Sequence, residues 1–159
     1  MKKFRKGFTL VELLIVIGIM GTLSSLAMVA GQEASDAAKA TNIADGLGKA
    51  SIAAMAYYAD NSDTIDVSGA KVADVVAGAN AYLKVTLVAT TPAEGQYAIA
   101  LSAEDDKTAT WWVAYKLAKT DSNVGKVLMN KKTRMELKKA MTGDNTEYDG
   151  TAIVYMQIR

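Results

Sequence analysis

The residues best placed for chemistry stand near the start of the chain, where the dipeptide Gly7-Phe8 precedes a single acid, Glu12. Between Phe8 and Ala30 this acid is the one ionisable side chain, and a carboxylate at such a position costs about 3 kcal/mol to insert into a membrane. It therefore needs a partner. Cleavage between Gly7 and Phe8 would create an α-amino group that could pair with Glu12 of a neighbouring copy.

The segment that carries Glu12 is long and apolar enough to cross a membrane. A helix over 8–30 would rise about 35 Å, compared with a hydrocarbon core of about 30 Å. The leader before it carries four cations, Lys2, Lys3, Arg5 and Lys6. Because positive charge stays on the cytoplasmic side, the sequence predicts a membrane-held chain with its N-terminus inside and its remainder outside.

The stretch GFTLVELLIVIGIMG, residues 7–21, resembles the class III signal peptide and N-terminal helix of type IV pilins and pseudopilins. The likeness covers residues 1 to about 35. It implies that a prepilin peptidase cleaves after Gly7 and methylates the new N-terminus at Phe8. It also implies that Glu12 pairs with a neighbour's N-terminus during assembly.

The same resemblance implies where the chain lies and what it meets. The precursor is expected in the bacterial inner membrane, where an assembly platform with its ATPase would build copies into a helical homo-oligomeric filament. The assembled filament would lie at the cell surface as a pilus, or fimbrium. Its expected roles are cell adhesion, twitching motility or DNA uptake.

Other interpretations of the first thirty residues remain open. An ordinary secretory signal peptide could end near Ser24, Ser25 and Ala27, but an acid within its apolar core argues against it. A plain single-pass anchor explains the length and leaves Glu12 without a partner. Glu12 could also cap the first turn of the helix, which is compatible with the pilin resemblance.

Length and composition limit the rest of the chain. Its 159 residues, less a seven-residue leader, suffice for one long helix and one small domain. Cysteine is absent, so no disulfide can fasten the C-terminus, and histidine is absent, which removes Ser-His and Cys-His nucleophile pairs. We expect neither an enzyme nor a cofactor, and no nucleic-acid site is evident.

We predict four parts: a leader at 1–7, a transmembrane or filament-core half-helix at 8–30, an amphipathic half at 31–60 and a globular head at 61–159. A stripe of helical period supports the amphipathic half, namely Ile43, Leu47, Ala50, Ala54 and Tyr57. The alternative is two helices broken near Gly46 and Gly48, because an interior glycine costs about 1 kcal/mol.

In the head, the pattern predicts a short helix at 70–77 and a basic helix at 122–141. Strands are predicted at 82–89, 96–102, 108–118 and 151–158, the second and third as a hairpin and the last as a tether for the C-terminus. The expected fold is α+β and pilin-like, with the C-terminal half of the long helix packed on a small antiparallel sheet of three to four strands. Adjacent Trp111 and Trp112 should face opposite sides of that sheet.

One loop concentrates oxygen ligands. Asn145, Glu147 and Asp149, followed by Gly150, echo the beginning of a calcium loop. The twelfth position of that register is Met156, where a bidentate glutamate would be needed, so a solvated turn is the favoured interpretation.

The leading functional hypothesis is thus a structural subunit of a type IV pilus that polymerises through its N-terminal helix. Within the same family, the alternative is a pseudopilin of a type II secretion or competence system. From another class, the competing hypothesis is a membrane-anchored binding domain that does not polymerise.

Overall fold

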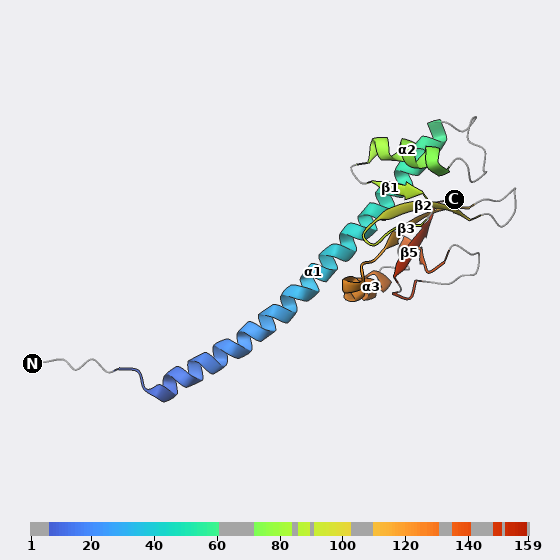
Figure 1. Ribbon diagram of the computed structural model, residues 1–159. Coiled ribbons are helices and arrows are strands. Elements are labelled where there is room, and N and C mark those ends of the chain that lie inside the picture. Colours follow the sequence, from blue (N-terminus) through green and yellow to red (C-terminus); the bar gives the residue numbers. More distant parts are fainter. Residues whose placement is uncertain are drawn as a thin grey trace, which may run out of the picture. The chain divides into compact units, whose positions relative to one another are not determined.

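The computed structural model describes residues 7–60, 72–83, 86–89, 91–102, 110–130, 135–140, 148–150 and 152–158. The chain comprises two compact units, Met1–Ser35 and Asp36–Arg159. Helix α1, Leu10–Asp60, contributes to both units and runs without interruption for 51 residues (Figure 1). The predicted continuous helix is therefore confirmed, and the alternative of two helices broken near Gly46 and Gly48 is wrong.

In the first unit, α1 is apolar on all sides. Large side chains from Phe8 to Val29 are between 43% and 87% exposed, so none of them is buried in a hydrophobic core of its own chain. Among the described helices, α1 alone is long and apolar enough to cross a membrane by length and composition. The prediction of an apolar helix of membrane-spanning length is confirmed.

In the second unit, α1 becomes amphipathic and buries one face in the core. The buried residues of this face are Ala40, Ile43, Ala44, Leu47, Ala50, Ser51, Ala53 and Ala54. Four members of the predicted stripe, Ile43, Leu47, Ala50 and Ala54, lie in this set, and Tyr57 packs against the core at its end. Small side chains dominate the face, which lets the helix lie close to the sheet.

A five-stranded sheet receives this helix, in the order β1-β2-β3-β5-β4. Its strands are β1 (Leu87–Ala89), β2 (Tyr97–Ser102), β3 (Thr110–Lys116), β4 (Leu137–Lys138) and β5 (Ile153–Gln157). β2 and β3 pair antiparallel from Tyr97↔Tyr115 to Ser102↔Thr110, so the predicted hairpin is confirmed. The α+β class is confirmed as well, with one more strand than expected and with β1 parallel to β2.

The final strand lies inside the sheet, between β3 and β4 (Figure 1). Its register pairs Ala114 with Tyr155 on one side and Leu137 with Met156 on the other. Two further backbone bonds extend the pairing, from the Leu117 N–H to the Ala152 carbonyl (2.7 Å) and from the Ile158 N–H to the Trp111 carbonyl (2.8 Å). The predicted backbone tether of the C-terminus is confirmed.

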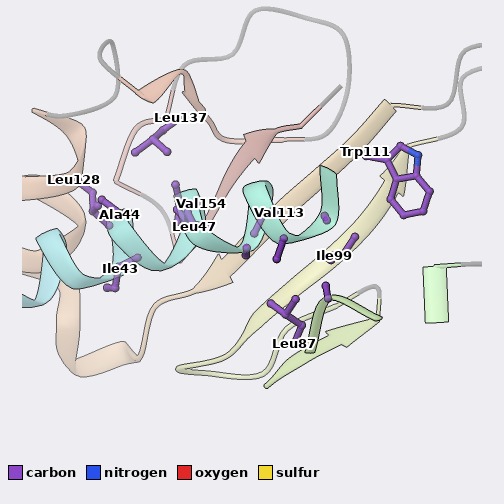
Figure 2. Packing of buried hydrophobic residues seen from close by; sticks show 14 of the residues in the cluster. Ile43, Ala44, Leu47, Leu87, Ile99, Trp111, Val113, Leu128, Leu137 and Val154 are labelled. Atoms are coloured by element: carbon purple, nitrogen blue, oxygen red, sulfur yellow. The ribbon is translucent and has the colours of Figure 1, made fainter. Parts of the chain in front are cut away.

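The core lies between α1 and one face of the sheet. Figure 2 shows Leu47 of α1 beside Val154, and Ala44 of the same helix beside Leu128. Other elements close the ends of this layer with buried side chains, namely Leu87, Ile99, Trp111, Leu128 and Leu137. Burying such aliphatic side chains contributes about 1.5–3 kcal/mol each, which makes this layer the main source of stability in the unit.

The first predicted strand, 82–89, is confirmed at Leu87–Ala89 and wrong at Tyr82, which lies in a helix. Helix α2, Val72–Tyr82, extends past the predicted end at 77, and β1 covers Leu87–Ala89. At the strand edge, the Asn80 side chain accepts from the Leu87 N–H (2.7 Å) and donates to the Leu87 carbonyl (3.1 Å). Asn80 thereby takes the place of a neighbouring strand and protects an exposed edge.

The predicted basic helix at 122–141 is confirmed over Ser122–Met129 and wrong at Leu137–Lys138, which form a strand. A 3-10 turn, η2 (Lys119–Asp121), leads into α3 (Ser122–Met129), and Asn130 is the C-cap of that helix. Farther along, Glu136 has a positive φ of 51° and Leu137 enters β4, where it is 2% exposed. At Leu137, pairing with Met156 in the sheet stabilises the extended conformation more than helix propensity favours a helix.

Trp111 and Trp112 lie on opposite faces of β3, as the pleat requires. Trp111 belongs to the core beside α1, whereas Trp112 does not. Yet Trp112 is only 3% exposed, and its Nε1 has no hydrogen-bond partner among the described residues. The prediction of opposite faces is correct, and both rings are buried.

Candidate processing and assembly site

The predicted cleavage junction lies just before the long helix. Gly7, Phe8 and Thr9 are outside any helix, and α1 begins at Leu10. Gly7 is exposed and has open space around it, since a Cβ there would meet no atom within 4 Å. Phe8 is 87% exposed. A peptidase could therefore bind the backbone on both sides of the Gly7–Phe8 bond without first unwinding the helix.

Directly after the junction, Thr9 and Glu12 hold each other in a reciprocal arrangement. The Thr9 N–H and the Thr9 hydroxyl both donate to Glu12 Oε2, each at 2.8 Å. In return, the Glu12 N–H donates to Thr9 Oγ1 at 3.3 Å. This is a capping box, in which two backbone donors at the start of a helix are satisfied by side chains three residues apart.

The capping box gives Glu12 a partner within its own chain, which confirms the interpretation of this acid as a first-turn cap. Thr9 was not singled out in the sequence, although the spacing Thr9-x-x-Glu12 before an apolar run is a recognisable capping signal. A negative charge also lies favourably at a helix N-terminus.

Hydrogen bonds from neutral groups do not cancel the charge of the carboxylate. Both Thr9 contacts fall on Oε2, and within the described part of the chain Oε1 accepts no hydrogen bond. A carboxylate oxygen with free lone pairs can still accept from a cation. The geometry thus leaves the Glu12 carboxylate oriented, with Oε1 open to a further donor.

The predicted calcium loop lies mostly outside the described residues, which include neither Asn145 nor Glu147. Asp149 is described, and its Oδ2 lies 2.6 Å from Nζ of Lys139. This carboxylate therefore already has a cation. Among the described residues, no three acidic side chains converge where a metal ion could be held.

A comparison of the chain with known protein families finds a match that covers this site. Residues 2–28 fit the family model described as the prokaryotic N-terminal methylation motif. The matched range contains Gly7, Phe8, Thr9 and Glu12 and ends within the apolar segment. No solved structure matches the chain.

Proposed function

We propose that this type IV pilin-like chain is the structural subunit of a type IV pilus, processed after Gly7 and polymerised through its N-terminal helix. The methylation motif implies processing by prepilin peptidase, and the motif together with an apolar helix indicates a membrane-held precursor. In the proposed pathway, the inner-membrane platform and its ATPase extract the processed chain and add it to a surface filament.

The capping box is the observation that carries the proposal. It fixes the Glu12 carboxylate one turn from the Gly7–Phe8 bond and leaves Oε1 open. Cleavage would turn the Phe8 nitrogen into a cation, and a neighbour's Phe8 cation could then approach that oxygen. Such a pair sets the register between copies more than it adds net stability.

The uncovered apolar segment supports the same function. Its side chains from Phe8 to Val29 have no cover within the chain. Lipid supplies that cover for the precursor, and helices of other copies would supply it in a filament. Because lipid already covers this surface in the precursor, van der Waals packing between helices would contribute more to assembly than removal of apolar surface from water.

Intact mass and N-terminal sequencing of filaments sheared from cells test the proposal. We expect a chain that begins at Phe8, carries one extra methyl group and is abundant in the sheared fraction. A Phe8 start confined to the cell envelope would favour a pseudopilin of type II secretion or competence. An uncut Met1 start would favour the non-polymerising membrane-anchored binding domain.

Substitution of Glu12 separates processing from assembly. In Glu12→Ala, the Gly7–Phe8 bond stays accessible, so we expect normal cleavage and a loss of filaments. Glu33→Ala is a matched control, because Glu33 is an exposed acid of the same helix beyond the apolar segment. Normal filaments from Glu12→Ala would contradict the proposed role of this acid.

A further inference from the structure

A cavity lies at the end of the core that Trp111 occupies. Figure 2 shows the Trp111 ring at the opposite end of the buried layer from Leu128. The cavity has a volume of about 260 Å³ and lies within the second unit, between α1, α2, β3 and the residue that follows β5. We call it the Trp111 cavity. Its lining residues are Ala54, Met55, Tyr58, Val75, Trp111 and Ile158.

The inner wall of the Trp111 cavity is firmly packed, whereas its outer side is accessible. Ala54, Val75 and Trp111 are buried members of the core cluster. Met55 is 45% exposed, and Tyr58, one turn farther along α1, is half-buried. The Met55 side chain is unbranched and changes rotamer readily. A small molecule could therefore enter past Met55 without separating α1 from the sheet.

The lining of the Trp111 cavity is uncharged. Among the residues that the structure describes, the lining side chains contribute one hydroxyl, from Tyr58, and one indole nitrogen, from Trp111. A buried water molecule typically makes about three hydrogen bonds, so this lining suits water poorly. An ion would lose its hydration without gaining an opposite charge. The cavity therefore suits an uncharged apolar molecule.

The volume of the Trp111 cavity limits the size of its occupant. An apolar protein cavity of about 150 Å³ binds benzene. By that ratio, the volume here accommodates about ten non-hydrogen atoms, which is the size of two fused rings. Sites for drug-sized molecules begin at about 300 Å³. The occupant is therefore smaller than a typical drug molecule.

The lining side chains favour an aromatic occupant over a saturated one. Trp111 and Tyr58 both present rings to the cavity. A third ring packed edge-to-face or offset against them is stabilised beyond the burial of its surface. The thioether sulfur of Met55 also makes favourable contacts with aromatic rings. A saturated molecule of the same shape would make neither kind of contact.

We infer that the Trp111 cavity is a binding site for a small, uncharged aromatic compound of one or two rings. The inference goes beyond the proposed pilus and does not depend on polymerisation, because each lining residue belongs to a single head. A compound that binds the folded head and not the unfolded chain also raises the stability of the head.

Photolabelling of the detergent-solubilised full-length chain tests the site. The probe is phenyl diazirine, an uncharged aromatic photolabel. Trypsin cleaves after lysine, so the lining residues of α1 fall in the peptide 50–71 and Trp111 falls in the peptide 108–116. We expect label in both peptides, and saturating naphthalene should reduce it about tenfold. The peptide 120–126, at the other end of the core, is the internal control.

A saturated competitor tests the chemical class of the ligand. Decalin has the same carbon skeleton as naphthalene but no aromatic ring, and we expect it to compete much more weakly. Both compounds also enter micelles, so they are compared at equal ratios to detergent. Equal competition by the two would overturn the aromatic preference and indicate a site for acyl chains. Label that naphthalene does not reduce, or reduces equally in the peptide 120–126, would overturn the site.

Two variants that fill the cavity give an independent readout. Ala54→Leu enlarges a side chain of α1, and Ile158→Phe enlarges one at the partly exposed end of the chain. Gly48→Ala is the matched control on α1, because a Cβ there meets no atom within 4 Å and position 48 does not line the cavity.

The readout for these variants is the unfolding temperature with and without naphthalene. Naphthalene should raise it for the unsubstituted chain and for Gly48→Ala, and should leave it unchanged for both filled variants. Near-ultraviolet circular dichroism first shows which variants are folded, and the two filled variants change different elements, so either one suffices for the test. A folded filled variant that responds to naphthalene as the unsubstituted chain does would overturn the inference.

Discussion

The ring of Tyr97, on β2, lies directly against Gly46 of α1, in the space that a side chain at position 46 would fill. The Tyr97 hydroxyl donates to the Asn42 carbonyl at 3.4 Å. On its other side the ring meets Tyr115, with 4.6 Å between the ring centroids. Gly46 is therefore the position at which an aromatic ring of the sheet seats on the helix.

Replacing this glycine should separate packing from helix propensity. Alanine at position 46 would collide with the Tyr97 ring, which we expect to cost about 1–3 kcal/mol of unfolding free energy. The gain in helix propensity offsets at most about 1 kcal/mol of that cost. Chemical denaturation of the detergent-solubilised chain, followed by tryptophan fluorescence, measures the difference.

Gly48, two residues away in the same helix, supplies the control. A Cβ there meets no atom within 4 Å, so Gly48→Ala should stabilise the helix by up to about 1 kcal/mol. If the alanine variants at positions 46 and 48 were equally stable, the contact between Tyr97 and Gly46 would not contribute to the free energy of unfolding.

These glycines also explain where sequence patterns succeeded and where they failed. The apolar stripe through Ile43 and Leu47 located the buried face of α1 because helical period is a local signal. Local reasoning ended the predicted short helix at residue 77, just before Gly78, and kept a helix break near Gly46 as an alternative. Each instead accommodates a tyrosine ring from outside its own helix, Tyr97 and Tyr57 respectively. Such contacts depend on tertiary packing and produce no periodic pattern in the sequence.

In the sheet, too, local patterns predicted some features, and tertiary contacts determined the others. Alternating patterns located β2, β3 and β5, but the placement of β5 between β3 and β4 depends on pairing between distant residues. β4, Leu137–Lys138, is too short to show a period and lies in a basic stretch that favours helix. At the site, residue types indicated Glu12 and its need for a partner, whereas the orienting role of Thr9 became visible in the geometry.

A second close contact fastens the C-terminal segment to α3. A Cβ on Gly125 would lie 2.8 Å from the Gly150 carbonyl oxygen, and Gly150 itself has a positive φ of 86°. Nearby, the Tyr148 N–H donates to the Leu137 carbonyl at 3.1 Å. In a chain without cysteine, these contacts and the central position of β5 hold the C-terminus in place.

We therefore expect Gly125→Ala to destabilise the head by about 1–3 kcal/mol, because the neighbouring atom is backbone and cannot rotate away. Thermal unfolding followed by near-ultraviolet circular dichroism measures the loss. Lys126→Ala, at the adjacent exposed position, should change the free energy by less than about 0.5 kcal/mol. Equal unfolding temperatures for these two variants would contradict the proposal that the contact between Gly125 and Gly150 holds the C-terminal segment against α3.

The capping box predicts a local effect at the start of α1. Thr9→Ala removes the hydroxyl that donates to Glu12 Oε2 and accepts from the Glu12 N–H. Loss of an N-cap costs about 1 kcal/mol, which corresponds to roughly fivefold faster exchange of the Glu12 amide hydrogen. Hydrogen exchange followed by NMR in micelles measures this rate. Thr9→Ser retains the hydroxyl and should exchange as slowly as the unsubstituted chain; fast exchange in the serine variant would exclude a capping role.

Two tyrosines of the head, the half-buried Tyr97 and the fully buried Tyr148, predict how stability changes at alkaline pH. Burial raises the pKa of Tyr97 and of Tyr148 to about 12, above the value of about 10 in an unfolded chain. The folded state therefore keeps these protons longer than the unfolded state, so their contribution is complete below about pH 10 and is lost as pH rises towards 12. The free energy of unfolding, measured by denaturation at several pH values, should fall over this interval.

Lysine deprotonation also contributes to the fall. The slope of the unfolding free energy against pH must therefore be compared between the unsubstituted chain and the variants Tyr97→Phe and Tyr148→Phe. Each variant should have a shallower slope, and unchanged slopes in both would show that neither phenol is protected by the fold.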